Sequence, residues 1–127
     1  MNEGKENIIA SKSYSFSLKV IELYKYLISE KKEYVLSKQF LRSGTSIGAN
    51  VHEAVASESK KDFVHKLGIA LKEARETSYW LRLLKDSSYI SSEQATELSG
   101  ASEEIIRILN SIILTTKERY FKNIHNS

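Results

Sequence analysis

The stretch that decides the fold is Arg42-Ser-Gly-Thr-Ser-Ile-Gly-Ala-Asn50-Val-His-Glu-Ala54. Its apolar residues recur at helical spacing, so we expect the stretch to lie inside a helix. Gly44 and Gly48 fall on one side of that helix, where each glycine costs up to about 1 kcal/mol relative to alanine. We interpret the pair as a point where a neighbouring helix approaches closely. The alternative, a phosphate cradle, is weaker, because Gly-x-x-x-Gly lacks the Gly-Lys-Ser/Thr ending that positions a phosphate.

Outward from this stretch, apolar periodicity predicts four helices, over about residues 11–30, 35–57, 59–86 and 92–121. We expect residues 1–10 to be a loose lead-in, with Ser11 or Ser13 capping the first helix. Ser59 is the expected cap of the third helix, and Ser91 or Ser92 that of the fourth. The chain of 127 residues has no proline, and its connections are short. It therefore predicts one all-α domain over residues 1–127, an antiparallel up-down-up-down four-helix bundle.

The third predicted helix carries more apolar surface than one neighbouring helix can cover. Two adjacent stripes run along it, the first through Phe63, Leu67, Ala70, Ala74, Thr77, Leu81 and Leu84, the second through Ile69, Glu73, Glu76, Trp80 and Leu83. Paired stripes on several helices exceed what a monomeric bundle buries. We therefore expect a homo-oligomer.

Composition narrows the class of protein. The chain has no cysteine, and its N-terminus has no apolar run long enough for a signal peptide. No segment approaches the roughly 20 apolar residues needed to span a bilayer. We therefore expect a cytoplasmic protein with no membrane partner. The net charge is only +3, so the position of the charges says more about a partner than their sum.

A carboxylate-bridged dimetal centre is the enzymatic function that a four-helix bundle invites, and it requires Glu-x-x-His on two of the helices. None of the histidines, His52, His65 and His125, has a glutamate three residues before it. The nearest approach is Asp62-x-x-His65. No serine lies in a recognisable nucleophile motif. We therefore expect no catalytic residue, no metal site and no cofactor, and a protein that is not an enzyme.

Polar residues interrupt the apolar stripes, and a buried polar residue needs hydrogen-bonding partners. They are Asn50, Glu53, Glu73 and Glu76. We interpret them as a structural polar network that fixes the register of the helices, with Arg42, Arg75 and Arg82 as candidate partners.

A basic stripe follows another face of the third helix. It consists of Lys61, His65, Lys72, Arg75, Tyr79 and Arg82, and Lys38 and Arg42 extend it from the second helix. A basic stripe with one aromatic ring can follow a phosphate backbone and stack a base. The simpler alternative is a solvated helix face, which is what most charge runs are. In a ring of subunits the stripe would repeat and its field would add.

Several motifs resemble one protein family: Ser46-Ile-Gly-Ala-Asn-Val-His-Glu53, Asp62-Phe63, Ile69-Ala70 and Tyr79-Trp-Leu-Arg-Leu-Leu84. They are similar to the four-helix bundle family of bacterial 23S rRNA intervening-sequence proteins, often labelled S23 ribosomal protein. The resemblance covers about Ser11 to Tyr120 and implies a bundle that assembles as a homopentamer. Members often carry Pro in place of Gly48 and Gly in place of Ala54, which places this chain in one branch of the family.

The resemblance also bears on function. The accessory protein of diversity-generating retroelements is similar in fold, forms a pentameric barrel and binds nucleic acid through a basic surface. Genes of the family can lie within inserts in 23S rRNA genes, which suggests an association with RNA. The resemblance and the stripe together favour nucleic-acid binding, with RNA preferred, through Lys61, Lys72, Arg75 and Arg82, with Tyr79 stacking on a base.

The alternative function is an oligomeric scaffold that docks a nucleic-acid-processing protein and does not itself contact nucleic acid. The position of the stripe discriminates between the two. If Arg75 and Arg82 are buried against Glu73, Glu76 or Glu53 of a neighbour, the stripe is structural and the scaffold is favoured.

Overall fold

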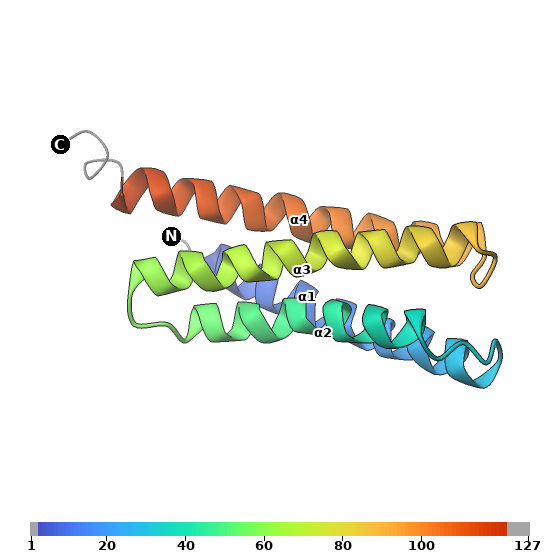
Figure 1. Ribbon diagram of the computed structural model, residues 1–127. Coiled ribbons are helices and arrows are strands. Elements are labelled where there is room, and N and C mark those ends of the chain that lie inside the picture. The colour runs from blue at the N-terminus through green and yellow to red at the C-terminus, as the bar shows by residue number, and fades with distance from the viewer. Residues whose placement is uncertain (1–2, 122–127) are drawn as a thin grey trace.

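The computed structural model describes residues 3–121, which form four α-helices and no strand (Figure 1). The helices are α1 (Glu3–Ser29), α2 (Leu36–Val55), α3 (Lys60–Asp86) and α4 (Ser92–Tyr120). The connections lie at alternate ends of the molecule, so that α1 packs against α2 and α4, and α3 packs against the same two helices (Figure 1). The all-α class and the four helices are as predicted.

The start of α1 corrects the prediction. The helix begins at Glu3, and not at about Ser11. Neither Ser11 nor Ser13 caps it: Ser13 is fully buried within the helix, and its hydroxyl donates to the Ala10 carbonyl. A serine is tolerated inside a helix when its hydroxyl bonds to the preceding turn in this way. Ile9, in the segment expected to be loose, is 1% exposed and extends the core by one turn.

The caps of α3 and α4 form as predicted. The Ser59 hydroxyl accepts from the Asp62 backbone N–H at 3.0 Å, and Ser91 forms a reciprocal capping box with Gln94. The Asp62 carboxylate does not complete a box, because it accepts from the Ser57 hydroxyl at 2.9 Å.

The start of α2 has a cap of a different kind, supplied by Glu33. Its carboxylate accepts from the backbone N–H groups of Val35, Leu36 and Ser37 at 2.6–3.1 Å. Burial raises the pKa of Glu33, but these hydrogen bonds outweigh it and leave the pKa below its ordinary value. This role was not predicted from the sequence, because glutamate is not among the usual capping residues.

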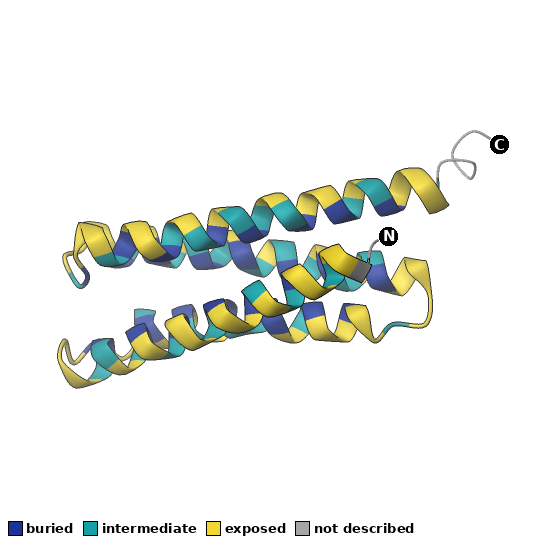
Figure 2. Ribbon diagram, turned by 180° about the vertical axis from the view of Figure 1, so that it is seen from behind, coloured by how far each residue is buried: buried dark blue, intermediate teal, exposed yellow. Residues whose placement is uncertain are grey.

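The core runs along the axis between the four helices (Figure 2). All members of the first predicted stripe of α3 are buried, as are Phe16, Val20, Leu23 and Leu27 of α1. The second stripe of α3 is only half-buried. This second stripe is therefore the part of the predicted apolar surface that the single chain leaves partly exposed to solvent.

The two glycines of the fold-deciding stretch lie where α2 meets α1. A Cβ atom built on Gly44 would lie 2.7 and 2.8 Å from the two methyl carbons of Val20. One built on Gly48 would lie 3.2 Å from the Ser17 hydroxyl and 3.3 Å from the Ser13 carbonyl. All four distances are shorter than ordinary van der Waals contact, so the predicted close approach of two helices is confirmed.

Candidate nucleic-acid interface

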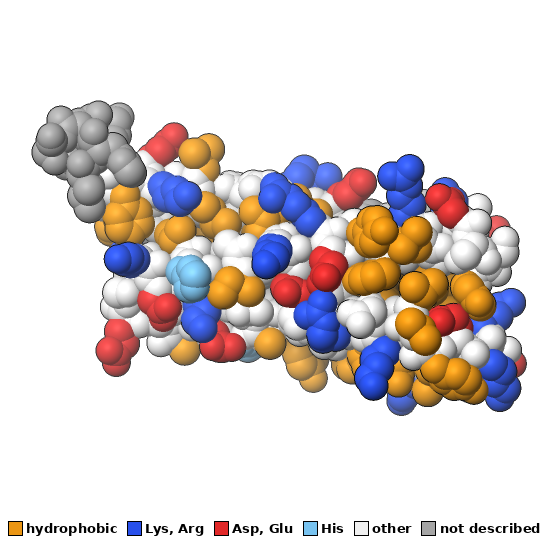
Figure 3. All heavy atoms as spheres, in the orientation of Figure 1, with side chains coloured by type: hydrophobic (Ala, Val, Ile, Leu, Met, Phe, Trp, Pro, Cys, Tyr) orange, Lys and Arg blue, Asp and Glu red, His pale blue; other side chains and the backbone are white. Residues whose placement is uncertain are grey.

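The basic stripe lies on the solvent side of α3, opposite the residues that enter the core. Its four cations, Lys61, Lys72, Arg75 and Arg82, are all exposed, and we call them the basic face. Positions spaced by three, four and seven residues share one side of a helix, which is why these residues line up. Figure 3 shows the side of the molecule on which α2 and α3 face the viewer, and Lys and Arg side chains recur along this side.

The basic face is little neutralised by its neighbours. Lys61, Lys72 and Arg75 make no ion pair with any residue between 3 and 121. Arg82 lies 3.9 Å from Asp86, and the two side chains are 82% and 61% exposed. Such an exposed pair is worth at most about 1 kcal/mol and is screened by salt. Arg75 and Arg82 are therefore free to meet an incoming anion.

Tyr79 lies between Arg75 and Arg82 on the same side of α3, and its side chain is 56% exposed. Its ring meets the ring of the half-buried Trp80 edge to face, with 5.2 Å between the centroids and an interplanar angle of 67°. Contacts of this geometry contribute about 0.5–1.5 kcal/mol beyond the area that they bury. The packed indole therefore restrains an exposed tyrosine ring.

The two cations predicted on α2 differ from each other. Lys38 is exposed, with no ion pair to a described residue. Arg42 lies between two carboxylates of α3, with Nη2 2.6 Å from Glu76 Oε2 and Nη1 3.5 Å from Glu73 Oε2. Arg42 is therefore part of the polar network, and it extends the basic face less than the sequence suggested.

The pKa of the Glu73 carboxyl, a member of this network, is shifted from its ordinary value. Burial raises its pKa above the ordinary value, the Arg42 guanidinium opposes this shift, and the Glu76 carboxylate adds to it. Its Oε2 atom is buried without a hydrogen bond from any described residue. One guanidinium thus serves two carboxylates, and the cluster keeps a net negative charge when both are ionised.

The other two members of the predicted network lie outside this cluster. Asn50 donates to the Ser46 carbonyl of its own helix at 2.8 Å. Glu53 accepts from Lys66 at 3.1 Å, two turns of α3 away from Glu73. The network therefore consists of Arg42, Glu73 and Glu76, while Asn50 and Glu53 each make a local or separate contact.

An apolar patch adjoins the basic face. Figure 3 shows hydrophobic side chains gathered over the right-hand ends of α2 and α3. In these segments Tyr34 and Val35 are 59% and 72% exposed, and Leu36, Trp80 and Leu83 are half-buried. Trp80 and Leu83 were predicted as part of the second stripe of α3. Tyr34 was not predicted, because it lies in the turn before α2, which has no periodic pattern.

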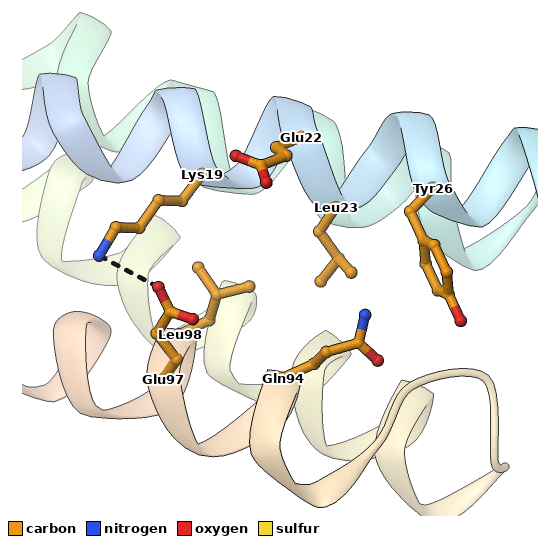
Figure 4. A pocket seen from close by; sticks show the side chains of 7 residues that line it. All are labelled: Lys19, Glu22, Leu23, Tyr26, Gln94, Glu97 and Leu98. Atoms are coloured by element: carbon orange, nitrogen blue, oxygen red, sulfur yellow. Dashed lines mark ion pairs between the residues drawn. The ribbon is translucent and has the colours of Figure 1, made fainter.

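A cleft of about 210 Å³ lies on the opposite seam, between α1 and α4 (Figure 4). Leu23 and Leu98 form its floor, and Lys19 bridges it to Glu97 at 3.4 Å (Figure 4). Among the described residues, Lys19 is the one cation that lines the cleft and it is already paired, while Glu22 makes no ion pair, so the lining is negative. This cleft does not favour a phosphate ligand.

Metal-binding side chains do not gather in the structure. Between residues 3 and 121, no group of three His, Asp or Glu side chains is placed to hold a metal ion. His65 is exposed on α3, and the His52 ring bonds to the Gly48 carbonyl at 2.8 Å. His125 lies outside the described residues. No helix of the described part is long and apolar enough to cross a membrane.

Comparison with known proteins identifies the family. Residues 5–111 match the family described as 23S rRNA-intervening sequence protein, and the chain belongs to this family. The fold is similar to the crystal structure of a protein of unknown function from the S23 ribosomal protein family of Bacteroides thetaiotaomicron. The two chains are 52% identical, the match covers 86% of this chain and 97% of the other, and the TM-score is 0.85. No curated protein matches the chain.

Proposed function

We propose that this protein binds nucleic acid without catalysing a reaction, and that RNA is its preferred ligand. The observation that carries the proposal is the basic face: four exposed cations along one side of α3, three of them without an ion pair to a described residue. Cations in this arrangement pair with successive phosphates and release their counterions. The family description, which names 23S rRNA, favours RNA over DNA and an association with 23S rRNA or the ribosome.

The working form of the protein in this proposal is a cytoplasmic homo-oligomer of antiparallel bundles, with five subunits as the family resemblance implies. The apolar patch supports self-association, because Tyr34, Val35 and Trp80 expose surface that a monomer leaves in water. In a closed ring the basic face would recur once per subunit. Multivalent contact with one RNA would then raise the affinity above that of a single chain.

The test is the binding of a fluorescent structured RNA to the purified protein across a salt series. We expect the logarithm of the affinity to fall linearly with the logarithm of the salt concentration, because phosphate contacts dominate. The variant Arg75→Glu/Arg82→Glu should abolish binding and leave the far-UV circular dichroism unchanged, since both side chains are exposed.

A matched control separates the position of the charge from its amount. Lys25 and Arg107 are exposed on α1 and α4, and Lys25→Glu/Arg107→Glu changes the net charge equally. This control should weaken binding far less than the α3 variant. Equal effects of the two variants would show that net charge alone drives binding, and normal binding by the α3 variant would refute the proposed site.

The second candidate is an oligomeric scaffold for a nucleic-acid-processing protein, and the apolar patch is the observation that favours it. Patches of exposed apolar surface mark protein contact sites. Burial of Arg75 and Arg82 against Glu53, Glu73 or Glu76 of a neighbouring subunit would further favour the scaffold. A protein partner that is retained after nuclease treatment, together with no RNA binding at low salt, would favour the scaffold.

A further inference from the structure

Tyr79 is an exposed aromatic ring within the basic face. Arg75 precedes it by one turn and Arg82 follows it by one turn, so a cation lies on either side of the ring along α3. From the helical rise, the two arginines are roughly 10 Å apart along the axis. Their long side chains can therefore reach two phosphates of one strand while the ring lies between them.

The ring is already restrained before a ligand arrives. Trp80 is half-buried and packs against the hydrophobic core, and its ring contacts the Tyr79 ring at 5.2 Å between centroids. A restrained side chain loses less conformational entropy on binding than a free one. Tyr14 on α1 is equally exposed, at 59%, but its ring contacts no other aromatic ring of residues 3–121 and no arginine lies on its helix.

The geometry discriminates between double-stranded and single-stranded RNA. An A-form duplex presents phosphates, ribose hydroxyls and base edges, and its base faces are covered by stacking. Against a duplex, Tyr79 would have no base to stack on and would hold the two arginines away from the backbone. In a single strand or a loop the bases are splayed out, and an aromatic ring can stack with any of them.

We infer that the basic face takes single-stranded or looped RNA, with one unpaired base stacked on the Tyr79 ring and the phosphates on either side paired with Arg75 and Arg82. This inference rests on the proposed function, and it specifies the class of RNA. Because every base has an aromatic face, the contact selects for an unpaired strand and not for a sequence.

The experiment compares two probes on the purified full-length protein. One is an unstructured oligoribonucleotide of about 12 nucleotides, within the range of single-strand site sizes, and the other is its duplex with the complementary strand. Fluorescence anisotropy gives both affinities at low salt. We expect Tyr79→Ala to weaken single-strand binding by about 5- to 100-fold and not to weaken duplex binding, because the ring only holds the two arginines away from a duplex. Tyr79→Phe, which keeps the ring, and the matched control Tyr14→Ala should bind like the wild type.

The single tryptophan of the chain provides a second measurement. Because Trp80 contacts Tyr79, a base that stacks on Tyr79 should change Trp80 fluorescence, and a duplex should not. The inference is overturned if Tyr79→Ala binds the single strand as tightly as the wild type, or if the duplex binds equally well and changes the fluorescence equally. The variant Arg75→Glu/Arg82→Glu distinguishes failure of this inference from failure of the proposed function. If this variant binds neither probe while Tyr79→Ala binds both normally, only the stacking is refuted. If it binds both probes normally, the proposed function fails as well.

Discussion

Replacing Gly44 with alanine tests the close approach of α1 and α2. The added methyl group would lie 2.7 and 2.8 Å from the two methyl carbons of Val20, which is fully buried. Valine is stiff about its first side-chain torsion, so it cannot turn away at low cost. Overpacking of this kind costs about 1–3 kcal/mol, and alanine recovers about 1 kcal/mol of helix propensity. The upper part of the overpacking range applies here, so we expect a net destabilisation of about 1–2 kcal/mol.

The matched control is Gly68→Ala, the same chemical change at an exposed site on α3. A Cβ atom there meets nothing within 4 Å, so the propensity term acts alone and should stabilise the protein by about 0.5–1 kcal/mol. Urea unfolding followed by circular dichroism, at one fixed chain concentration, measures both changes. If Gly44→Ala is as stable as Gly68→Ala, the tight contact with Val20 does not exist.

The remaining predictions concern helix caps and buried carboxyls. Ser91→Ala should destabilise the protein by about 0.5–2 kcal/mol, measured by urea unfolding, because it removes the cap of α4; an unchanged midpoint would contradict this role. The pKa of Glu33 is lowered on folding, so its contribution to stability is present above the unfolded value of 4.5 and is lost as the pH falls through the folded value. Glu33→Gln should therefore flatten the loss of stability on acidification, and a wild-type slope would contradict the cap. The pKa of Glu73 is raised, so stability falls as the pH rises from 4.5 through the folded value. Glu73→Gln should remove this fall, which thermal unfolding at several pH values would detect, and a fall of wild-type size in the variant would contradict the raised pKa.

The fold was largely predictable because the apolar spacing of α3 is regular. Every residue of its first stripe is buried, and the caps at Ser59 and Ser91 follow local rules that a sequence displays. The predicted start of α1 was wrong, because residues 3–10 are mostly polar and, among residues 4–10, only Ile9 is buried. Helix formation there depends on packing against the rest of the bundle, which a local pattern does not reveal.

The basic face was predictable, but the polar network was only partly so. The face depends on spacing within one helix, which the sequence contains. The network depends on how α2 and α3 are rotated and shifted relative to each other, which is a property of the packed pair. That rotation brings Arg42 to Glu73 and Glu76 and directs Asn50 back to its own helix. The cap by Glu33 is local, but it was missed because glutamate is not among the usual capping residues.

Helix geometry explains why the basic face stays open. Glu73 and Glu76 lie two positions and one position from Arg75, and residues at these spacings do not face each other on a helix. Arg42 reaches both carboxylates from α2, at 2.6 Å from Glu76, and its single charge offsets part of theirs. Arg75 is left exposed toward solvent, with no ion pair in the described chain. The helix thus keeps its partly neutralised carboxylates beside α2 and a row of exposed cations on its solvent side, and this separation is what the proposed function requires.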